Sequence, residues 1–431
     1  MSSIFEGFLS TLEVQEAFGD RRFVAAMLRF EAALARAQAR TGLIPDSAAK
    51  SIIGSCKVEL FDVPKLVRES GRAGSIAVPL VRSLQEAVGL FNPAAVPHTH
   101  FGCISQDVVD TAMALVTREA LVLIAADVDR TLYALLDLAE RHAATPILAR
   151  TLMQPASVAS FGLKCAGWAA PLVRSRQRLR QAAGQALQLQ LGGAVGTLAE
   201  MKGHGPEVAR LMAEELGLRV PLSHWQTQRD EWVALGCELG LLVGSLGKLA
   251  RDMALMAQFE VAELAEAHEP GRGGSSAMPH KRNPVGAMVA LAAAQRAPQR
   301  VAALLQAMPQ EHERALGHWQ VELAEWPQLV MAAHGSARAM AQAIPGLRID
   351  THRMQANLEA VRASLPADAV AAWFHPGLAD HAAGLARGQV QSLRAMARAQ
   401  DDALPRPVPA VPAHGTGSAP QAPAKTTPLD H

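Results

Sequence analysis

The chain has 431 residues, of which 49% are hydrophobic and 19% are charged, a composition typical of a folded globular protein with two or three domains. The 41 lysines and arginines are balanced by 40 aspartates and glutamates, so no charge excess predicts binding to nucleic acid or to a membrane surface. The low aromatic content of 4%, together with abundant alanine, favours closely packed helices over sheets.

Apolar residues that recur at steps of three and four predict a succession of helices. The expected helices span residues 14–41, 78–89, 108–142, 156–191, 229–265, 284–308 and 319–344. Several of them exceed twice the mean helix length of about 11–12 residues, and they carry no heptad repeat. We therefore expect an all-α fold that is built on a bundle of long helices.

Four glycines lie at helical spacing within the helix expected at residues 229–265: Gly236, Gly240, Gly244 and Gly247. Each glycine costs about 0.5–1 kcal/mol of helix stability relative to alanine. The row is explained by the close approach of a second helix backbone, or else by sequence drift in an alanine-rich helix. The first interpretation predicts a tight helix crossing along this face.

We expect three helical domains followed by a tail. Residues 1–98 are assigned to an N-terminal helical domain, residues 99–348 to the central long-helix bundle, and residues 349–400 to a small C-terminal helical domain. Residues 401–431 contain seven prolines and almost no large apolar side chains, so this tail is expected to be disordered.

The cysteines and the apolar segments predict a soluble cytoplasmic protein. The four cysteines are far apart and form no CxxC pair, as is usual for a reduced chain without a disulfide or zinc framework: Cys56, Cys103, Cys165 and Cys237. Residues 1–16 lack the basic and then apolar pattern of a signal peptide. Charged residues interrupt the apolar segment 235–256, which is interpreted as a buried helix and not as a membrane span.

The segment 271–284 lies between two expected helices and reads Gly-Arg-Gly-Gly-Ser-Ser-Ala-Met-Pro-His-Lys-Arg-Asn-Pro. Its glycines suit a mobile loop that closes over a substrate, and its backbone amides can bind an anion such as a carboxylate. Lys281 and Asn283 add a positive charge and a hydrogen-bond donor. An ordinary linker would explain the glycines and serines, but not the residues that follow them.

This segment, the signature loop, resembles the GSSxMPxKxNP signature of the fumarase/aspartase superfamily. The resemblance implies that Ser275 is the catalytic acid or base and that Lys281 and Asn283 stabilise an aci-carboxylate anion. Ser276 and Met278 belong to the same motif and are expected to bind substrate.

Residues 100–111 are similar to a second superfamily pattern, HxGxTSxDxxDT. The similarity implies that His100 and Ser105 contact the substrate, and we include the adjacent Gln106 in the same site. Without the resemblance, this segment is a polar loop that enters a helix, with Asp107 as a helix cap.

Residues 150–164 are similar to a third pattern, RTxxQxAxPxxFGxK, which implies that Arg150, Thr151 and Gln154 face the substrate. In the superfamily, the three regions come from different subunits and meet in one pocket. The resemblance therefore implies a homotetramer with shared active sites.

Further similarities, spread over most of the chain, are to the bacterial 3-carboxy-cis,cis-muconate cycloisomerases. Adenylosuccinate lyases read RTHxQ in the third region and use that histidine as the general acid, whereas Leu152 occupies the position here. Cycloisomerases carry Trp or Leu there. The similarity also extends to residues 308–314, which implies that Arg314 binds the substrate.

The resemblance implies that a small tricarboxylate is closed to 4-carboxymuconolactone in protocatechuate (β-ketoadipate) catabolism. No metal or organic cofactor is expected for this chemistry. Some positions depart from the cycloisomerase pattern: Ile104, Val158, Gln226 and Pro366. These departures leave two alternatives open, an adenylosuccinate-type lyase that releases fumarate and a non-catalytic helical oligomer with the same fold. Leu152 argues against the lyase.

Other polar clusters are interpreted as incidental. The His98/His100 and His312/His318 pairs have no third ligand at a suitable spacing, so no metal site is predicted. Four glutamates are expected on solvated helix faces: Glu311, Glu313, Glu322 and Glu325.

Overall fold

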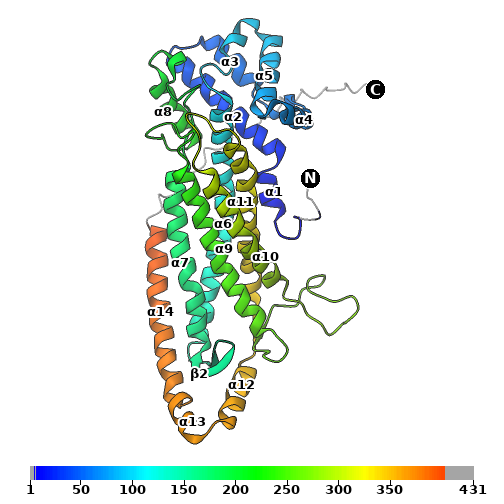
Figure 1. The fold of residues 1–431 in the computed structure, drawn as a ribbon, viewed down its shortest axis with the longest axis vertical. Coiled ribbons are helices and arrows are strands. Elements are labelled where there is room, and N and C mark those ends of the chain that lie inside the picture. Colours follow the sequence, from blue (N-terminus) through cyan, green and yellow to red (C-terminus); the bar gives the residue numbers. More distant parts are fainter. Residues whose placement is uncertain (1–3, 5, 403–431) are drawn as a thin grey trace, which may run out of the picture.

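Long helices that run side by side along the molecular axis form the centre of the fold (Figure 1). The computed structural model describes residue 4 and residues 6–402. The central helices of this part are α6 (Ser105–Arg141), α7 (Phe161–Ala186), α9 (Asp230–Met256), α10 (Val285–Ala307) and α11 (His318–Ala343). The predicted bundle is confirmed, and the bounds expected for α10 and α11 differ from the observed ones by one residue at each end.

Shorter helices cover one end of the bundle, at the top of Figure 1. They are α2 (Asp20–Arg40), α3 (Asp46–Ser55), η1 (Val58–Leu60), α4 (Val63–Ala73), α5 (Ala77–Phe91), η2 (Pro93–His98), η3 (Ala199–Met201) and α8 (Gly205–Leu216). The first helix, α1 (Leu12–Ala17), lies along the side of the bundle against α6 and α11. The single helix expected at residues 14–41 is in fact two. The chain breaks at Gly19, whose extended backbone, with ψ at 148°, precedes the first residue of α2.

Two short antiparallel strand pairs lie toward the opposite end. They are β1 (Pro146–Thr151) with β2 (Gln154–Ser160), and β3 (Leu264–Ala265) with β4 (Arg348–Ile349). The helix predicted at residues 156–191 was therefore wrong over its first residues, which belong to β2. Ser160 marks the change, because its hydroxyl accepts a hydrogen bond from the Leu163 amide at 3.1 Å and caps α7. Likewise, α9 ends at Met256 and does not reach residue 265.

The C-terminal part consists of α12 (Thr351–Ser364), α13 (Ala367–Trp373), η4 (Ile344–Gly346) ahead of them, and α14 (Pro376–Asp402). Pro366 lies between α12 and α13, where a proline is incompatible with one continuous helix. The last helix, α14, runs back along α7 (Figure 1). Asp401 is helical and accepts a hydrogen bond from the Tyr133 hydroxyl at 2.8 Å, so the start of the predicted tail is ordered. The rest of that tail, residues 403–431, lies outside the described residues.

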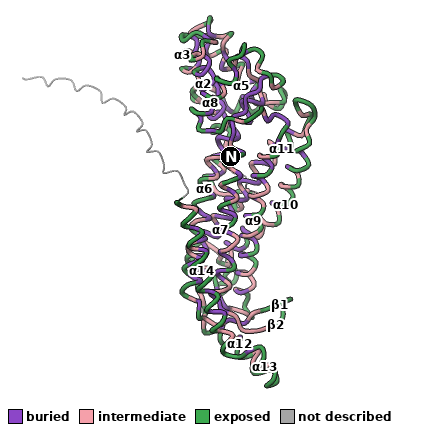
Figure 2. Tube along the Cα trace, turned by 90° about the vertical axis from the view of Figure 1, so that its left-hand side faces the viewer, coloured by how far each residue is buried: buried purple, intermediate pink, exposed green. Residues whose placement is uncertain are grey.

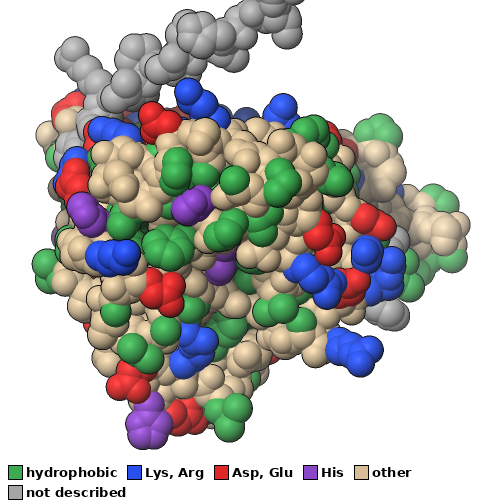
Figure 3. All heavy atoms as spheres, turned by 90° about the horizontal axis from the view of Figure 1, so that it is seen from above, with side chains coloured by type: hydrophobic (Ala, Val, Ile, Leu, Met, Phe, Trp, Pro, Cys, Tyr) green, Lys and Arg blue, Asp and Glu red, His purple; other side chains and the backbone are tan. Residues whose placement is uncertain are grey.

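One continuous hydrophobic core joins the N-terminal helices to the bundle. Figure 2 shows its buried residues along the inside of the bundle, with exposed residues on the outside. The apolar helix α9 is long enough to cross a membrane, but it packs against α7, α10 and α11. On the face seen in Figure 3, acidic and basic side chains are interspersed. The division of the chain into three domains stays a prediction.

The glycine row of α9 faces α10 at three of its four positions. A Cβ atom on Gly236 would lie 2.9 Å from Leu304 Cδ1, and one on Gly240 would lie 2.7 Å from Val301 Cγ2. A Cβ on Gly247 would overlap the Cβ of Ala294. The close approach of α10 is therefore confirmed, except at Gly244, where an added Cβ would have no atom of another element within 4 Å.

Gly247→Ala is expected to lower the free energy of unfolding by about 1–3 kcal/mol, because the added methyl group forces α9 and α10 apart. Ala294→Gly in the same chain should recover part of that loss. The matched control, Gly244→Ala, should gain up to about 1 kcal/mol from helix propensity. Urea unfolding followed by circular dichroism measures all three. Equal losses at residues 244 and 247 would contradict the explanation by close approach.

Candidate active site

His100 lies in the turn that connects the N-terminal helices to α6. Its backbone has a φ of 62°, in the left-handed region that non-glycine residues rarely adopt. Its Nδ1 atom is 2.7 Å from Oε1 of Glu31 on α2 and 3.2 Å from Cys103 Sγ. Gln38, also on α2, donates a hydrogen bond to the Phe101 carbonyl at 2.7 Å. Helix α2 therefore fixes the backbone and the ring of His100.

Asp107 caps α6, as expected, and it also binds a second loop. Its carboxylate accepts hydrogen bonds from the amides of Ile104 at 3.0 Å, Gly192 at 2.9 Å and Gly193 at 3.0 Å. Burial raises the pKa of Asp107 to about 6, although these backbone hydrogen bonds act in the opposite direction. Through its hydrogen bonds to Gly192 and Gly193, the carboxylate holds the loop at residues 187–198 against the start of α6.

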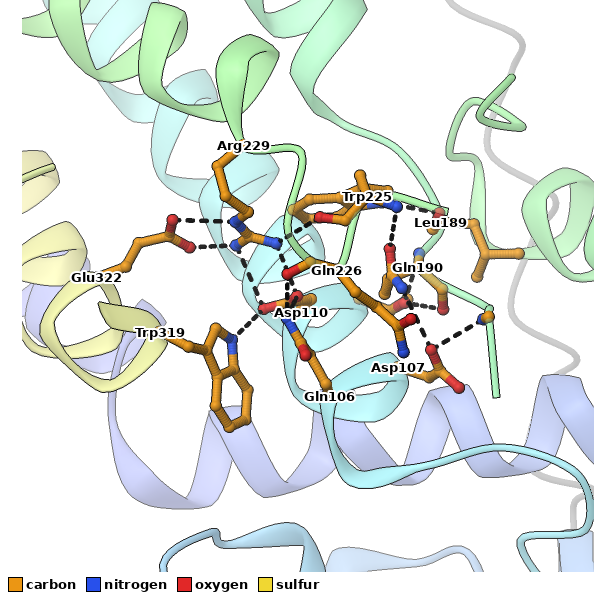
Figure 4. A network of polar contacts seen from close by, with 12 residues as sticks. Gln106, Asp107, Asp110, Leu189, Gln190, Trp225, Gln226, Arg229, Trp319 and Glu322 are labelled. Carbon is orange, nitrogen blue, oxygen red and sulfur yellow. Dashed lines mark hydrogen bonds and ion pairs between the residues drawn. The ribbon is translucent and has the colours of Figure 1, made fainter. Parts of the chain in front are cut away.

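A buried ionic network lies behind these loops (Figure 4). The Arg229 guanidinium pairs with both Asp110 and Glu322; its Nη1 is 2.8 Å from Asp110 Oδ2 and its Nε is 3.0 Å from Glu322 Oε2. The Trp225 ring lies 4.3 Å from the guanidinium carbon, and Trp319 Nε1 donates to Asp110 at 2.9 Å. The network connects α6, the start of α9 and α11, and it lies next to residues 100–111, which are predicted to bind substrate.

Glu322 corrects an expectation from the sequence. It is only 2% exposed and does not lie on a solvated face. It follows Trp319 by three residues and precedes Trp326 by four, so all three side chains point from one side of α11 into the core. That spacing was the signal that could have identified it. Glu311, Glu313 and Glu325 are exposed or half-buried.

The predicted residues at this end differ in their surroundings. Ser105 is half-buried at the first position of α6. Gln106 is buried, and its amide nitrogen donates to the Gln226 carbonyl at 2.7 Å. Arg314 is exposed and donates to the Ala194 carbonyl at 3.0 Å, which places the loop at residues 308–317 at the same end as His100.

The hairpin of β1 and β2 carries the third motif at the far end of α6. Thr151 and Gln154 are exposed and pair across its tip. Between them, Leu152 and Met153 have φ values of 50° and 67° and are 96% and 71% exposed. Two apolar side chains thus project from a strained turn, a conformation that costs of order 1–3 kcal/mol per residue.

Arg150, expected to face the substrate, is bound within the chain. Its two terminal nitrogens lie 2.8 and 3.1 Å from the carboxylate oxygens of Glu263, which is buried. The Asn357 amide also donates to Glu263 at 3.0 Å. This forked pair connects the hairpin to the segment that leads into the signature loop and to α12.

The signature loop projects from the side of the bundle between α9 and α10 (Figure 1). Glu266 closes the base of this excursion, since its carboxylate accepts hydrogen bonds from the amides of Gly286 and Ala287, each at 2.9 Å. Within the loop, the Asn283 amide donates to the Gly273 carbonyl at 2.8 Å, and Ser275 Oγ accepts from the Met278 amide at 3.1 Å.

The side chains of the signature loop are accessible. Ser275 and Asn283 are half-buried, whereas Ser276, Met278 and Lys281 are exposed. Lys281 lines an open cleft of about 860 Å³ together with Arg348 and His352. No predicted residue of the other two motifs lines this cleft.

The His100 group of predicted site residues lies apart from the other two groups within one chain. Helix α6 has 37 residues, so its ends, with Ser105 at one and the hairpin after the other, are about 55 Å apart. Helix α9 begins beside the network of Arg229 and runs for 27 residues, about 40 Å, before the signature loop. A pocket that contains His100, Thr151 and Ser275 therefore requires more than one chain.

Glu31, His100 and Cys103 are the one set of three metal-type donors in the described part of the chain, with donor atoms within 4.8 Å of one another. The Nδ1–Oε1 distance of 2.7 Å and the Nδ1–Sγ distance of 3.2 Å are hydrogen-bond distances. Two ligands of a tetrahedral zinc ion, with bonds of about 2.0–2.3 Å, are separated by about 3.3 Å or more. The three side chains therefore form a hydrogen-bonded cluster.

A sequence profile described as "Lyase" matches residues 10–298, more than half of the chain. The chain belongs to the fumarase/aspartase superfamily of lyases. It is 43% identical over 369 residues to 3-carboxy-cis,cis-muconate cycloisomerase of Pseudomonas aeruginosa, and this alignment covers 86% of this chain and 80% of the Pseudomonas aeruginosa protein. It is 39% identical over 401 residues to nitrosuccinate lyase of Streptomyces davaonensis, which covers 91% and 82%.

The crystal structure of 3-carboxy-cis,cis-muconate lactonizing enzyme from Pseudomonas putida matches the fold with a TM-score of 0.83 and 37% identity. The match covers 92% of this chain and 99% of that one. The all-α fold expected from the resemblance to the fumarase/aspartase superfamily is thereby confirmed.

In this superfamily member, the sequence motifs did not reveal the residues that hold the motifs in place. Glu31, Glu263 and Glu266 each bind a motif segment or its boundary, and Glu322 stabilises the network beneath one. Glu31 lies four residues after Met27 and three before Leu34, all buried on α2. A charged residue at an apolar helix position was thus a detectable signal for Glu31, as it was for Glu322.

Proposed function

We propose that the protein is a cytoplasmic 3-carboxy-cis,cis-muconate cycloisomerase that forms 4-carboxymuconolactone in protocatechuate (β-ketoadipate) catabolism. The observation that supports it most is Leu152 at the exposed tip of the hairpin, in a chain 43% identical to a cycloisomerase. An adenylosuccinate-type lyase has the histidine that acts as its general acid at this position, and an alkyl side chain such as that of Leu152 cannot supply a proton.

The proposed reaction is an isomerisation in which one carboxylate oxygen of the substrate bonds to an alkene carbon and closes the lactone. The electron pair of that double bond moves toward a neighbouring carboxylate and gives an aci-carboxylate. Lys281, Asn283 and Arg314 would stabilise this anion through a positive charge and hydrogen-bond donors. Ser275 would deliver its hydroxyl proton to carbon and regain one from solvent, so the tricarboxylate trianion takes up one proton as it closes to the lactone dianion.

The active site is proposed to be shared between subunits of a homotetramer. Long helices that associate in antiparallel fashion would bring the His100 end of one chain to the hairpin end of another. Two-fold symmetry would form each such contact twice, so a closed assembly has as many sites as chains. The exposed, strained Leu152–Met153 turn is consistent with a segment that is covered in the assembly.

The first test incubates the purified protein with 3-carboxy-cis,cis-muconate and follows the loss of the diene absorbance, with Ser275→Ala as the control. Rapid loss that disappears in the variant is the expected result. A stable diene, with active release of fumarate from adenylosuccinate, would replace the proposal by the adenylosuccinate-type lyase. Properly folded protein that converts none of the substrates offered would support the non-catalytic oligomer.

A second candidate is elimination from a substituted succinate, because the nitrosuccinate lyase match covers 91% of the chain. Both reactions use an aci-carboxylate, but elimination needs a base where cyclisation needs an acid. Nitrite release from nitrosuccinate, measured beside the diene assay, distinguishes the two. A preference for nitrosuccinate in kcat/KM would overturn the cycloisomerase proposal.

A further inference from the structure

Glu31 is a carboxylate buried beside His100, and the proposed reaction does not use it. Its side chain is 1% exposed, and its Oε1 atom accepts the hydrogen bond from His100 Nδ1 at 2.7 Å. Its Oε2 atom has no hydrogen-bond partner among the described residues. A carboxylate that is removed from water in this way is strongly disfavoured unless a cation lies beside it. His100 is the group placed to provide that charge.

The orientation of His100 is fixed from two sides. Its backbone is held in the left-handed region, with Phe101 bound by Gln38, and its Nδ1 atom is committed to Glu31. The Nε2 atom makes no hydrogen bond within the described part of the chain, and the ring is 15% exposed. Nε2 is therefore available to a ligand, while the hydrogen bond of Nδ1 to Glu31 holds the ring in place.

Three neighbouring groups act on the charge of this ring: Glu31 from α2, Cys103 from the same turn and Asp107 from α6. Burial alone would lower the pKa of His100, but the charge and hydrogen bond of Glu31, together with the charge of Asp107, raise it overall. The Cys103 thiol is neutral, since burial and the charge of Glu31 raise its pKa well above the usual range. The cluster thus favours an imidazolium with one N–H free.

We infer that Glu31 is a positioning residue that holds the His100 ring and keeps it cationic, so that Nε2–H binds a carboxylate of the substrate. The inference rests on the proposed function for its substrate class, a small polycarboxylate. It assigns the recognition of one substrate carboxylate to a pair of residues that are 69 positions apart in the chain. The negative charge of Glu31 is essential to this role, and a hydrogen-bond acceptor alone would not suffice.

Glu31→Gln tests this, because the amide oxygen still accepts from Nδ1–H but the charge is lost. The probe is tricarballylate, an unreactive tricarboxylate, titrated by calorimetry into the intact oligomer between pH 6 and pH 8. Wild-type affinity should vary less over this interval, since Glu31 raises the pKa of His100. In Glu31→Gln that pKa is lowered, so the imidazolium is lost at a lower pH than in wild type and affinity should fall about tenfold between pH 6 and pH 8.

Glu86→Gln, the same change at an exposed residue of α5, is the matched control and should behave as wild type. Glu31→Asp keeps the charge and should retain the wild-type pH profile at lower affinity, which guards against a folding defect in Glu31→Gln. In a His100→Gln background, Glu31→Gln should have no further effect on binding. An unchanged pH profile in Glu31→Gln, or an equal loss without His100, would overturn the inference.

Turnover measurements separate this inference from the proposed function. With 3-carboxy-cis,cis-muconate at pH 8, Glu31→Gln should raise KM about tenfold and change kcat little, because a ground-state carboxylate contact is weakened. If the diene is not a substrate but tricarballylate still shows the predicted loss, the proposed function fails and the role of Glu31 stands. If Glu31→Gln converts the diene with an unchanged KM, the proposed function stands and the role of Glu31 fails.

Discussion

Two inactive variants of this protein are expected to regain activity when their subunits are mixed. His100→Ala removes the imidazole at one end of α6, and Ser275→Ala removes the hydroxyl of the signature loop. Each alone should lower kcat/KM by about 10²–10⁴. Co-refolding equal amounts of the two should restore about one quarter of wild-type activity, because a closed homo-oligomer assembles its variants at random.

The physical reason for this recovery is distance. The ends of α6 are about 55 Å apart, and α9 carries the chain about 40 Å from the His100 end before Ser275 is reached. A site that uses both residues must take them from two chains. In a mixed oligomer, a chain with native His100 meets a chain with native Ser275 in about one site in four.

A matched pair of variants provides the control. Ser275→Ala and Lys281→Ala alter two residues of one loop, which a single subunit contributes to a site. Mixing these two variants should restore nothing, since every loop carries one defect. The diene assay measures both mixtures, with each variant refolded alone as the baseline. Recovery in the control pair, or none in the His100/Ser275 pair, would contradict the shared site.

The bundle could be predicted from the sequence because its signal is local and long. In α10 and α11, apolar residues recur at helical spacing over more than twenty residues, so the expected bounds were accurate. The hairpin strand β2 gave no comparable signal. Its seven residues are small, polar or half-buried, and tertiary contacts with the bundle decide their conformation.

The motifs identified candidate site residues, but not what surrounds them. Arg150 was placed beside the substrate by resemblance, yet its nearest anion is Glu263, 113 residues further along the chain. Local spacing cannot report a pairing across that distance. What the sequence did contain was the unusual position of Glu31 and Glu322, charged residues on the buried faces of α2 and α11. A charged residue on the buried face of a helix predicts a buried polar or charged partner, but it does not identify which residue that partner is.

Arg229→Met is expected to lower the free energy of unfolding by about 3–5 kcal/mol. Arg229 is only 2% exposed and lies between the carboxylates of Asp110 and Glu322. Methionine fills much of the same volume, so the loss comes mainly from two buried carboxylates without a counter-ion. Urea unfolding at pH 8, followed by circular dichroism, measures the change.

The exposed Arg210 of α8 offers a matched control, because it too pairs with two acidic side chains, Glu207 and Glu214. Water solvates all three groups there, so Arg210→Met should change the unfolding free energy far less than Arg229→Met does. Arg229→Lys keeps a charge in the network but loses the planar guanidinium that binds both carboxylates. Its loss of unfolding free energy should therefore lie between those of Arg210→Met and Arg229→Met. Equal effects of the two methionine variants would contradict a stabilising role for the buried network.

The pH dependence separates charge from packing in the Arg229→Met variant. Burial raises the pKa of Glu322, and Arg229 opposes that rise. Without Arg229, the folded-state pKa lies further above its unfolded value, so the folded protein binds protons more readily than the unfolded chain. Its stability should then increase, relative to wild type, as the pH is lowered from 8 toward that pKa. A deficit that does not change with pH would instead show that lost packing around the guanidinium, and not the uncompensated carboxylates, destabilises the variant.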